Sequence, residues 1–150
     1  MIEVIRISQK NHLDEAFAIR REVFVDEQKV SPEDEYDEFE TTSRHFLALI
    51  DGKPAGTSRW RRTSGGIKLE RFAVRKAFRG SGVGKALVKA VLNDVFSEQP
   101  EPIERIYLHA QLSAMPLYAG FGFVPVGPMF EECAIQHYKM ILPPAAYPHN

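Results

Sequence analysis

The chain has 150 residues, of which 44% are hydrophobic and 26% charged, and its formal net charge at pH 7 is −1. This length suits one domain with a sizeable core, and the composition is typical of a soluble globular protein. The near-neutral charge excludes an overall basic field that would favour nucleic acid, and the apolar runs are too short to cross a membrane.

The sequence predicts a cytoplasmic protein. Its first residues lack the charged and then apolar regions of a secretory signal. The single cysteine, Cys133, has no partner for an internal disulfide, which is compatible with a reducing compartment. We expect Cys133 to be a small buried residue rather than a nucleophile.

The first predicted elements are a strand over residues 4–7 and a helix over residues 13–28. The apolar residues of the second segment recur at helical spacing, and Asn11 precedes it as a plausible cap. Residues 31–44 are polar and acidic, which predicts a loop that could include a helical turn.

Three antiparallel strands are predicted next, forming a meander. Residues 45–50 and 54–62 are rich in strand-forming residues and flank Asp51-Gly52, a typical hairpin turn. A further turn leads to the third strand, over residues 67–74.

A glycine-rich tract over residues 79–84 follows this third strand and leads into an amphipathic helix over residues 83–96. Glycines allow a tight turn and a close approach of main-chain N–H groups to a ligand. A helix N-terminus adds unpaired donors and a partial positive charge, so this turn can bind a phosphate or pyrophosphate. A purely structural turn is the alternative.

Two familiar phosphate-binding motifs do not fit the tract. A Walker A loop requires a hydroxyl residue after Gly84-Lys85, where the chain has Ala86, and a glycine at Arg79. The dinucleotide fingerprint G-x-G-x-x-G requires glycine at Lys85 or Leu87, depending on where it starts. A pattern R-x-x-G-x-G remains, over residues 79–84.

The C-terminal part predicts a strand over residues 103–110, a short helix over residues 114–119 and two more strands. Residues 121–124 lead into the first of these, and residues 134–142 form the last. The order β-α-β-β-β-α-β-α-β-β indicates one α/β domain over residues 1–142, with a loose tail over residues 143–150.

Two motifs in this order resemble the GNAT superfamily of N-acetyltransferases. The first is R-x-x-G-x-G over residues 79–84, and the second is L-Y-x-x-x-G-F over residues 117–123. The resemblance covers residues 1–142. It implies the GNAT (acyl-CoA N-acyltransferase) fold, in which helices flank a mixed, mostly antiparallel sheet that is splayed between its central strands.

A narrower likeness connects the chain with the ElaA-like branch of that superfamily. Residues 20–28 match R-x-x-V-F-V-x-E-Q, and an acidic stretch followed by His45 matches the spacing downstream. Residues 132–140 are similar to E-D-G-I-P-H-x-x-M, from which Cys133, Ala134 and Gln136 depart.

The resemblance implies that an amine attacks acetyl-CoA directly in a ternary complex, with no acetyl-enzyme and no metal. The main-chain amides of the glycine tract would bind the pyrophosphate, and the pantetheine would pair with the strand ending at residue 74. The expected cofactor-binding residues are Phe72, Ala73, Val74, Arg79, Gly80, Ser81, Gly82, Val83, Gly84, Lys85, Gln111 and Ser113.

Two residues are candidates for proton transfer. Tyr118 is the family's tyrosine in the second motif and would protonate the leaving thiolate. Glu70 is two residues before Phe72, so strand periodicity places both on one face, and Glu70 would act as the base directly or through water. His109 and His137 are alternative bases, because histidine titrates in the useful range.

The acceptor is expected to be a primary amine of a small molecule or a protein. Residues 26–40 are strongly acidic and could attract a cationic amine or simply be solvated. Trp60, among three arginines, could face an acidic acceptor or solvent. A homodimer, a non-catalytic acyl-CoA sensor and a preference for a longer acyl chain are all compatible with the sequence.

Overall fold

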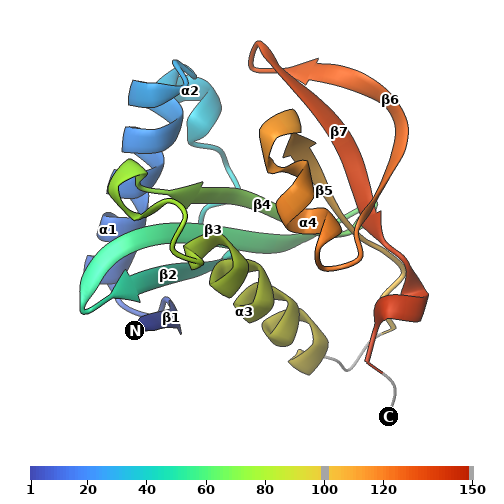
Figure 1. Ribbon diagram of the computed structural model, residues 1–150, viewed down its shortest axis with the longest axis horizontal. Helices are drawn as coiled ribbons and strands as arrows, with labels where there is room; N and C mark the ends of the chain where they lie inside the picture. The colour runs from blue at the N-terminus through green and yellow to red at the C-terminus, as the bar shows by residue number, and fades with distance from the viewer. Residues whose placement is uncertain (99–101, 149–150) are drawn as a thin grey trace.

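The computed structural model describes residues 1–98 and 102–148 and contains one seven-stranded sheet, in the order β1-β2-β3-β4-β5-β7-β6 (Figure 1). Among the described strands, β4 and β5 pair in parallel and the other neighbours are antiparallel, which confirms the mixed, mostly antiparallel sheet. The strands are β1 Ile2–Arg6, β2 Arg44–Ile50, β3 Lys53–Thr63, β4 Gly66–Val74, β5 Ile106–Gln111, β6 Val124–Glu132 and β7 Ile135–Leu142.

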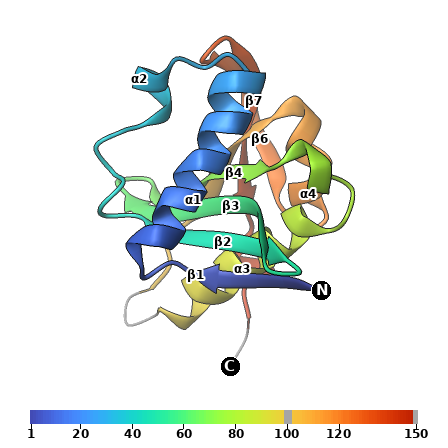
Figure 2. The same ribbon diagram turned by 90° about the vertical axis from the view of Figure 1, so that its left-hand side faces the viewer.

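The helices cover both faces of this sheet. Helix α1 lies across one face of β2, β3 and β4, and α3 lies against the other (Figure 2). The α-helices are α1 Lys10–Arg20, α2 Pro32–Glu35, α3 Val83–Ser97 and α4 Met115–Ala119. The shorter helical turns are η1 Arg21–Glu27, η2 Lys76–Phe78, η3 Leu112–Ala114 and η4 Pro144–Ala146.

The larger hydrophobic core lies between α3 and the sheet. The apolar residues of α3 recur at helical spacing, and each buried one removes enough surface from water to contribute about 1.5–3 kcal/mol. The predicted apolar face is confirmed, since the buried α3 side chains are Val83, Leu87, Val88, Val91, Leu92 and Val95. No helix within the described ranges combines the length and apolar character needed to cross a membrane.

The first helix differs from the prediction at both ends. It begins at Lys10 after Gln9, so the predicted cap at Asn11 is wrong. After Arg20 the chain widens into the π-helical turn η1, in which the Gln28 N–H bonds the Val23 carbonyl at 3.1 Å. Such turns carry an extra residue, which here redirects the end of the helix toward a hollow in the sheet.

The sheet splays between β4 and β5, as expected. These strands pair over Ile67–Ile106, Lys68–Tyr107 and Leu69–Leu108, and the pairing stops there. Beyond that point β5 continues beside β7, and β4 continues beside β3. The facing edges of β4 after Leu69 and of β5 after Leu108 are therefore unpaired and can accept a ligand between them.

A β-bulge at Arg71 changes which β4 residues share a face. Arg71 has a φ of +59°, and the register moves from Arg59–Glu70 to Thr57–Ala73. Because Thr57 and Arg59 lie on one face of β3, Glu70 and Ala73 share that face, and Phe72 lies on the other. The prediction that Glu70 and Phe72 share a face is therefore wrong, because simple alternation does not allow for the bulge.

The C-terminal part differs from the prediction in two places. Cys133 is exposed rather than buried, because it and Ala134 have φ values of +51° and +62° in the turn between β6 and β7. Such turns favour Asn-Gly or Asp-Gly, which accounts for the D-G of the branch motif at these positions. The tail is not loose over its described part, residues 143–148, because Tyr147 packs on Phe96 at 5.5 Å between ring centroids. Residues 149–150 of the tail lie outside the described residues.

Candidate active site

The glycine tract forms an open turn between η2 and α3. Gly80 and Gly82 have φ values of +82° and +92°, a region that side-chain-bearing residues rarely adopt. Within the part of the chain that the structure describes, no group accepts a hydrogen bond from the main-chain N–H groups of residues 80–85. The turn therefore presents successive free donors at the N-terminus of a 15-residue helix, which is suited to binding an anion.

Side chains of the tract contribute to its shape rather than filling it. The Arg79 guanidinium donates to the Val74 carbonyl at 2.9 Å and to the Glu27 carboxylate at 2.9 and 3.0 Å. Ser81 donates to the Phe78 carbonyl, and Lys85 is exposed. Gly84 lets α4 approach α3, since a Cβ there would lie 3.2 Å from the Leu117 side chain.

A first hollow, of about 420 Å³, leads from this turn toward α4. Eight of the predicted cofactor-binding residues line it; Ala73 and Gln111 line a second hollow instead, and Ser81 and Lys85 line neither. The eight residues are Phe72, Val74, Arg79, Gly80, Gly82, Val83, Gly84 and Ser113.

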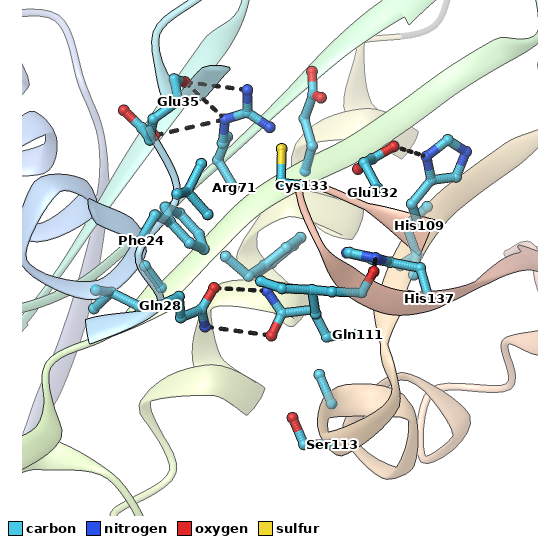
Figure 3. Close-up of a pocket in the computed structure, with 18 of the residues that line it drawn as sticks. Phe24, Gln28, Glu35, Arg71, His109, Gln111, Ser113, Glu132, Cys133 and His137 are labelled. Atoms are coloured by element: carbon cyan, nitrogen blue, oxygen red, sulfur yellow. Dashed lines mark hydrogen bonds and ion pairs between the residues drawn. The ribbon is translucent and has the colours of Figure 1, made fainter. Parts of the chain in front are cut away.

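The second hollow has a volume of about 400 Å³ and opens between η1, β4, β5 and the turn joining β6 to β7 (Figure 3). The two hollows share six lining residues and therefore adjoin where the sheet splays. The residues common to both are Phe72, Val74, Arg79, Ser113, Ala114 and Tyr118.

Tyr118 lies at this junction. Its ring packs edge-on against Phe72 at 5.6 Å and against Phe123 at 6.2 Å, and the residue is 6% exposed. Burial holds the pKa of its hydroxyl far above the ordinary value of 10.0. The phenol therefore remains protonated at neutral pH, as a proton donor requires.

Glu70 lies in the second hollow among three cations. Its Oε1 accepts hydrogen bonds from Arg59 at 2.9 Å and Arg61 at 2.5 Å, and its Oε2 lies 3.6 Å from the Lys68 ammonium. Burial alone would raise the pKa of Glu70, but these three positive charges lower it below the ordinary value. A carboxylate held in this way has little tendency to take up a proton.

Both candidate histidines line the second hollow. The Nδ1 of His137 lies 2.7 Å from the Ile135 carbonyl, and the Nδ1 of His109 lies 3.2 Å from the Glu132 carboxylate. Each partner is an acceptor, so in both neutral rings Nδ1 carries the proton and Nε2 has the lone pair.

An amide pair spans the second hollow. Gln28 and Gln111 exchange two hydrogen bonds, at 2.9 and 3.3 Å, and join the end of η1 to the end of β5 (Figure 3). Gln111, an expected pantetheine ligand, therefore already has a partner. Val23 and Phe24, which line the hollow from η1, had no predicted role, although the V-F-V-x-E-Q likeness marks this segment, whereas Glu27 and Gln28 fall in the acidic stretch that could attract a cationic amine.

Four of the eight acids of residues 26–40 are bonded by arginines of the same chain. Arg20 and Arg59 are fully buried, and their guanidinium groups bond carboxylates of this segment at 2.5 to 3.0 Å. Arg71 bonds Asp37 as well, and Arg79 bonds one further acid, Glu27. The basic strand around Trp60 thus faces this segment through Arg59 and Arg61, and the Trp60 indole donates to Asp94 at 2.8 Å.

The sequence profile described as "Acetyltransferase (GNAT) domain" matches residues 7–143 of this chain. The chain belongs to the GNAT acetyltransferase family. It is 34% identical over 141 residues to the Bacillus subtilis protein named "Uncharacterized N-acetyltransferase YjcF", covering 93% of this chain and 99% of that one.

Two solved structures confirm the GNAT fold. Escherichia coli ElaA matches with a TM-score of 0.77 and 25% identity, over 93% of this chain and 99% of that one. An acyl-CoA N-acyltransferase from Pseudomonas aeruginosa matches with a TM-score of 0.77 and 26% identity, over 94% and 99% of the respective chains. The likeness to the ElaA-like branch therefore holds in both sequence and structure.

Replacing Gly82 with valine is expected to weaken coenzyme A binding at least about 10-fold, because a β-branched residue cannot keep a φ of +92° and the turn would change shape. Isothermal titration with coenzyme A measures this effect. Gly52 is a matched control, since its φ of +81° lies in a hairpin turn outside both hollows. Equal affinity in Gly82→Val and the parent would show that the turn does not bind the ligand.

Proposed function

We propose that this protein is an N-acetyltransferase that transfers an acetyl group from acetyl-CoA to a primary amine of a small molecule or protein. The observation that carries the proposal is the junction of the two hollows at Phe72 and Tyr118. A cofactor entering from the glycine tract and an acceptor entering from the second hollow would meet there. Such an arrangement supports direct attack of the amine on the thioester within a ternary complex.

Coenzyme A would be held mainly by main-chain groups. The free N–H groups of residues 80–85 are suited to the pyrophosphate. The unpaired edge of β4 after Leu69 is suited to the pantetheine, whose amides can pair as an added strand does. Arg79 adds positive charge at the first hollow once its contact with Glu27 is shared or broken.

Tyr118 would complete the transfer by protonating the leaving group. As the new C–N bond forms and the C–S bond breaks, the phenol gives its proton to the thiolate sulfur. The substrate ammonium loses two protons in total. One restores the Tyr118 phenol and the other is released to solvent, so that the products are an amide, a free thiol and one proton.

Binding and turnover test the proposal separately. At 100 times its dissociation constant, acetyl-CoA is expected to stabilise the protein by about 2.7 kcal/mol and to raise its Tm by roughly 5–10 °C. Thiol release is then followed with spermidine, lysine and a short peptide with a free N-terminus. No Tm shift at millimolar acetyl-CoA would contradict the binding proposal, and a shift without turnover would favour an acyl-CoA sensor.

The same assay addresses the acyl chain. Propionyl-CoA and butyryl-CoA are compared with acetyl-CoA under identical conditions, using the ratio of kcat/KM for each donor. A higher kcat/KM for propionyl-CoA or butyryl-CoA than for acetyl-CoA would show that the protein prefers to transfer that longer acyl group, and the fold assignment would not change.

A further inference from the structure

We propose that His137 is the general base of this site and that Glu70 instead balances the charge of the buried arginines. The inference rests on the proposed function, because it assigns the group that accepts the proton of the attacking amine. Three observations support it. They are the position of His137 on β7, the free Nε2 of its ring, and the ion pairs and hydrogen bonds that already engage Glu70 and His109.

The strand register places His137 beside the reaction centre. β4 and β5 run parallel from Ile67–Ile106 to Leu69–Leu108, and the bulge at Arg71 adds one residue to β4, so continuing along both strands brings Gln111 to the level of Ala73, next to Phe72. His137 is directly opposite Gln111 on β7, and facing residues share one side of a sheet. His137 therefore lies next to the level of Phe72, whose ring contacts Tyr118, and it lines the same hollow as both residues.

The ring of His137 is fixed with an acceptor nitrogen left over. Nδ1–H donates to the Ile135 carbonyl at 2.7 Å, and Phe130 stacks on the ring at 5.7 Å with an interplanar angle of 22°. The residue is only 6% exposed and lines the second hollow. Within the described part of the chain Nε2 makes no hydrogen bond, so its lone pair is available to a substrate.

The competing groups are less well placed. Glu70 is occupied by Arg59, Arg61 and Lys68, and it lies before the bulge in β4, at the level of His109 rather than of His137. His109 is opposite Lys139, at the level of Glu70, and Figure 3 shows its ring turned toward Glu132. His137 is therefore the candidate base at the level of the reacting atoms.

The reaction balances with His137 in this role. Nε2 takes one proton from the substrate ammonium, and the resulting neutral amine attacks the thioester carbonyl carbon. The C–S bond breaks, and Tyr118 protonates the sulfur. The second nitrogen proton restores the Tyr118 phenol, and the His137 imidazolium releases its proton to solvent before the next cycle.

With a histidine as the base, kcat/KM is expected to fall as the pH decreases, with the midpoint of this acidic limb between about pH 5 and 8, because the protonated ring cannot accept a proton. Charged and titratable groups on all neighbouring elements will move this limb, so its position is measured rather than assumed. Those lining the same hollow as His137 include Glu35 from α2, Lys68, Glu70 and Arg71 from β4, His109 from β5 and Glu132 from β6.

The test compares His137→Ala, His137→Gln and His109→Gln with the parent, using acetyl-CoA and spermidine, lysine or a free peptide N-terminus. His12→Gln on α1, outside both hollows, is the control for replacing a histidine. We expect both His137 variants to lose about 100-fold or more in kcat, to lose the acidic limb and to keep their affinity for coenzyme A. Added imidazole is expected to restore part of the activity of His137→Ala.

Three results would overturn the inference. Parental kcat with an intact acidic limb in His137→Ala would exclude His137 as the base, as would loss of that limb in His109→Gln instead. Nitrogen chemical shifts that place the His137 proton on Nε2 would also exclude it, whether or not the variants are active. A parent protein that releases no thiol with any of these amines would instead overturn the proposed function, and the base with it.

Discussion

Replacing Tyr118 with phenylalanine is expected to lower kcat by about 100-fold while changing the dissociation constant of acetyl-CoA little, because a general acid contributes at least this factor in typical enzymes. The change removes one oxygen and keeps the ring, whose contacts with Phe72 and Phe123 lie at 5.6 and 6.2 Å. Thiol release measures kcat, and calorimetric titration measures acetyl-CoA affinity.

Tyr107→Phe is the matched control for this experiment. The Tyr107 hydroxyl lies 2.6 Å from the Thr63 hydroxyl, outside both hollows, so its removal should cost about 1 kcal/mol of stability and leave kcat unchanged. If Tyr118→Phe turned over as fast as the parent, another group or water would protonate the thiolate. A loss of acetyl-CoA affinity as large as the loss of kcat would assign Tyr118 to binding instead.

Much of the fold follows from local patterns in the sequence. The alternating strands around Asp51-Gly52 predict the meander because a type I′ turn fixes their register, and both turn residues have positive φ as that turn requires. The apolar spacing in α3 predicts its buried face for a similar reason: the helical period alone determines which residues meet the sheet.

The features that escaped prediction depend on one extra residue in a regular element. At Arg71 the extra residue makes a bulge and moves Glu70 away from the face of Phe72. In η1 it widens the helix and turns Gln28 toward Gln111. Neither has a reliable local signal, because an arginine with positive φ, like a π-helical turn, is held by tertiary contacts rather than by residue preference.

The ion pairs of the acidic segment likewise depend on tertiary contacts that the sequence does not show. The acids of residues 26–40 suggest a field for a cationic amine, but the sequence does not tell which arginines lie opposite them. The structure brings Arg20 from α1 and Arg59 from β3 to this segment, and each pairs with acids 15 to 22 residues away in the chain. The composition therefore predicts that the segment is acidic, but it does not predict which arginines pair with its carboxylates.

Replacing Arg59 with methionine is expected to lower the free energy of unfolding by about 3–5 kcal/mol, since removal of one member of a buried ion pair leaves its partners uncompensated. Arg59 is 0% exposed and bonds Asp37, Glu40 and Glu70 at 2.5 to 3.2 Å. Urea unfolding followed by circular dichroism measures the change. Arg62→Met is the control, because Arg62 lies exposed on the same strand and stacks on Trp60 at 5.7 Å.

Lowering the pH is expected to reduce the difference in the free energy of unfolding between the parent and Arg59→Met. Burial alone would raise the pKa of Asp37, but the hydrogen bonds from Arg59 and the Phe39 N–H lower it from 3.8 to about 2. A carboxyl whose pKa is lowered by folding stabilises the protein above its unfolded pKa, and this contribution is lost as pH falls through the folded value. The difference in unfolding free energy should therefore shrink from about pH 4 to about pH 2. A difference that stays constant over this interval would mean that Arg59 stabilises the fold by packing rather than by holding these carboxylates.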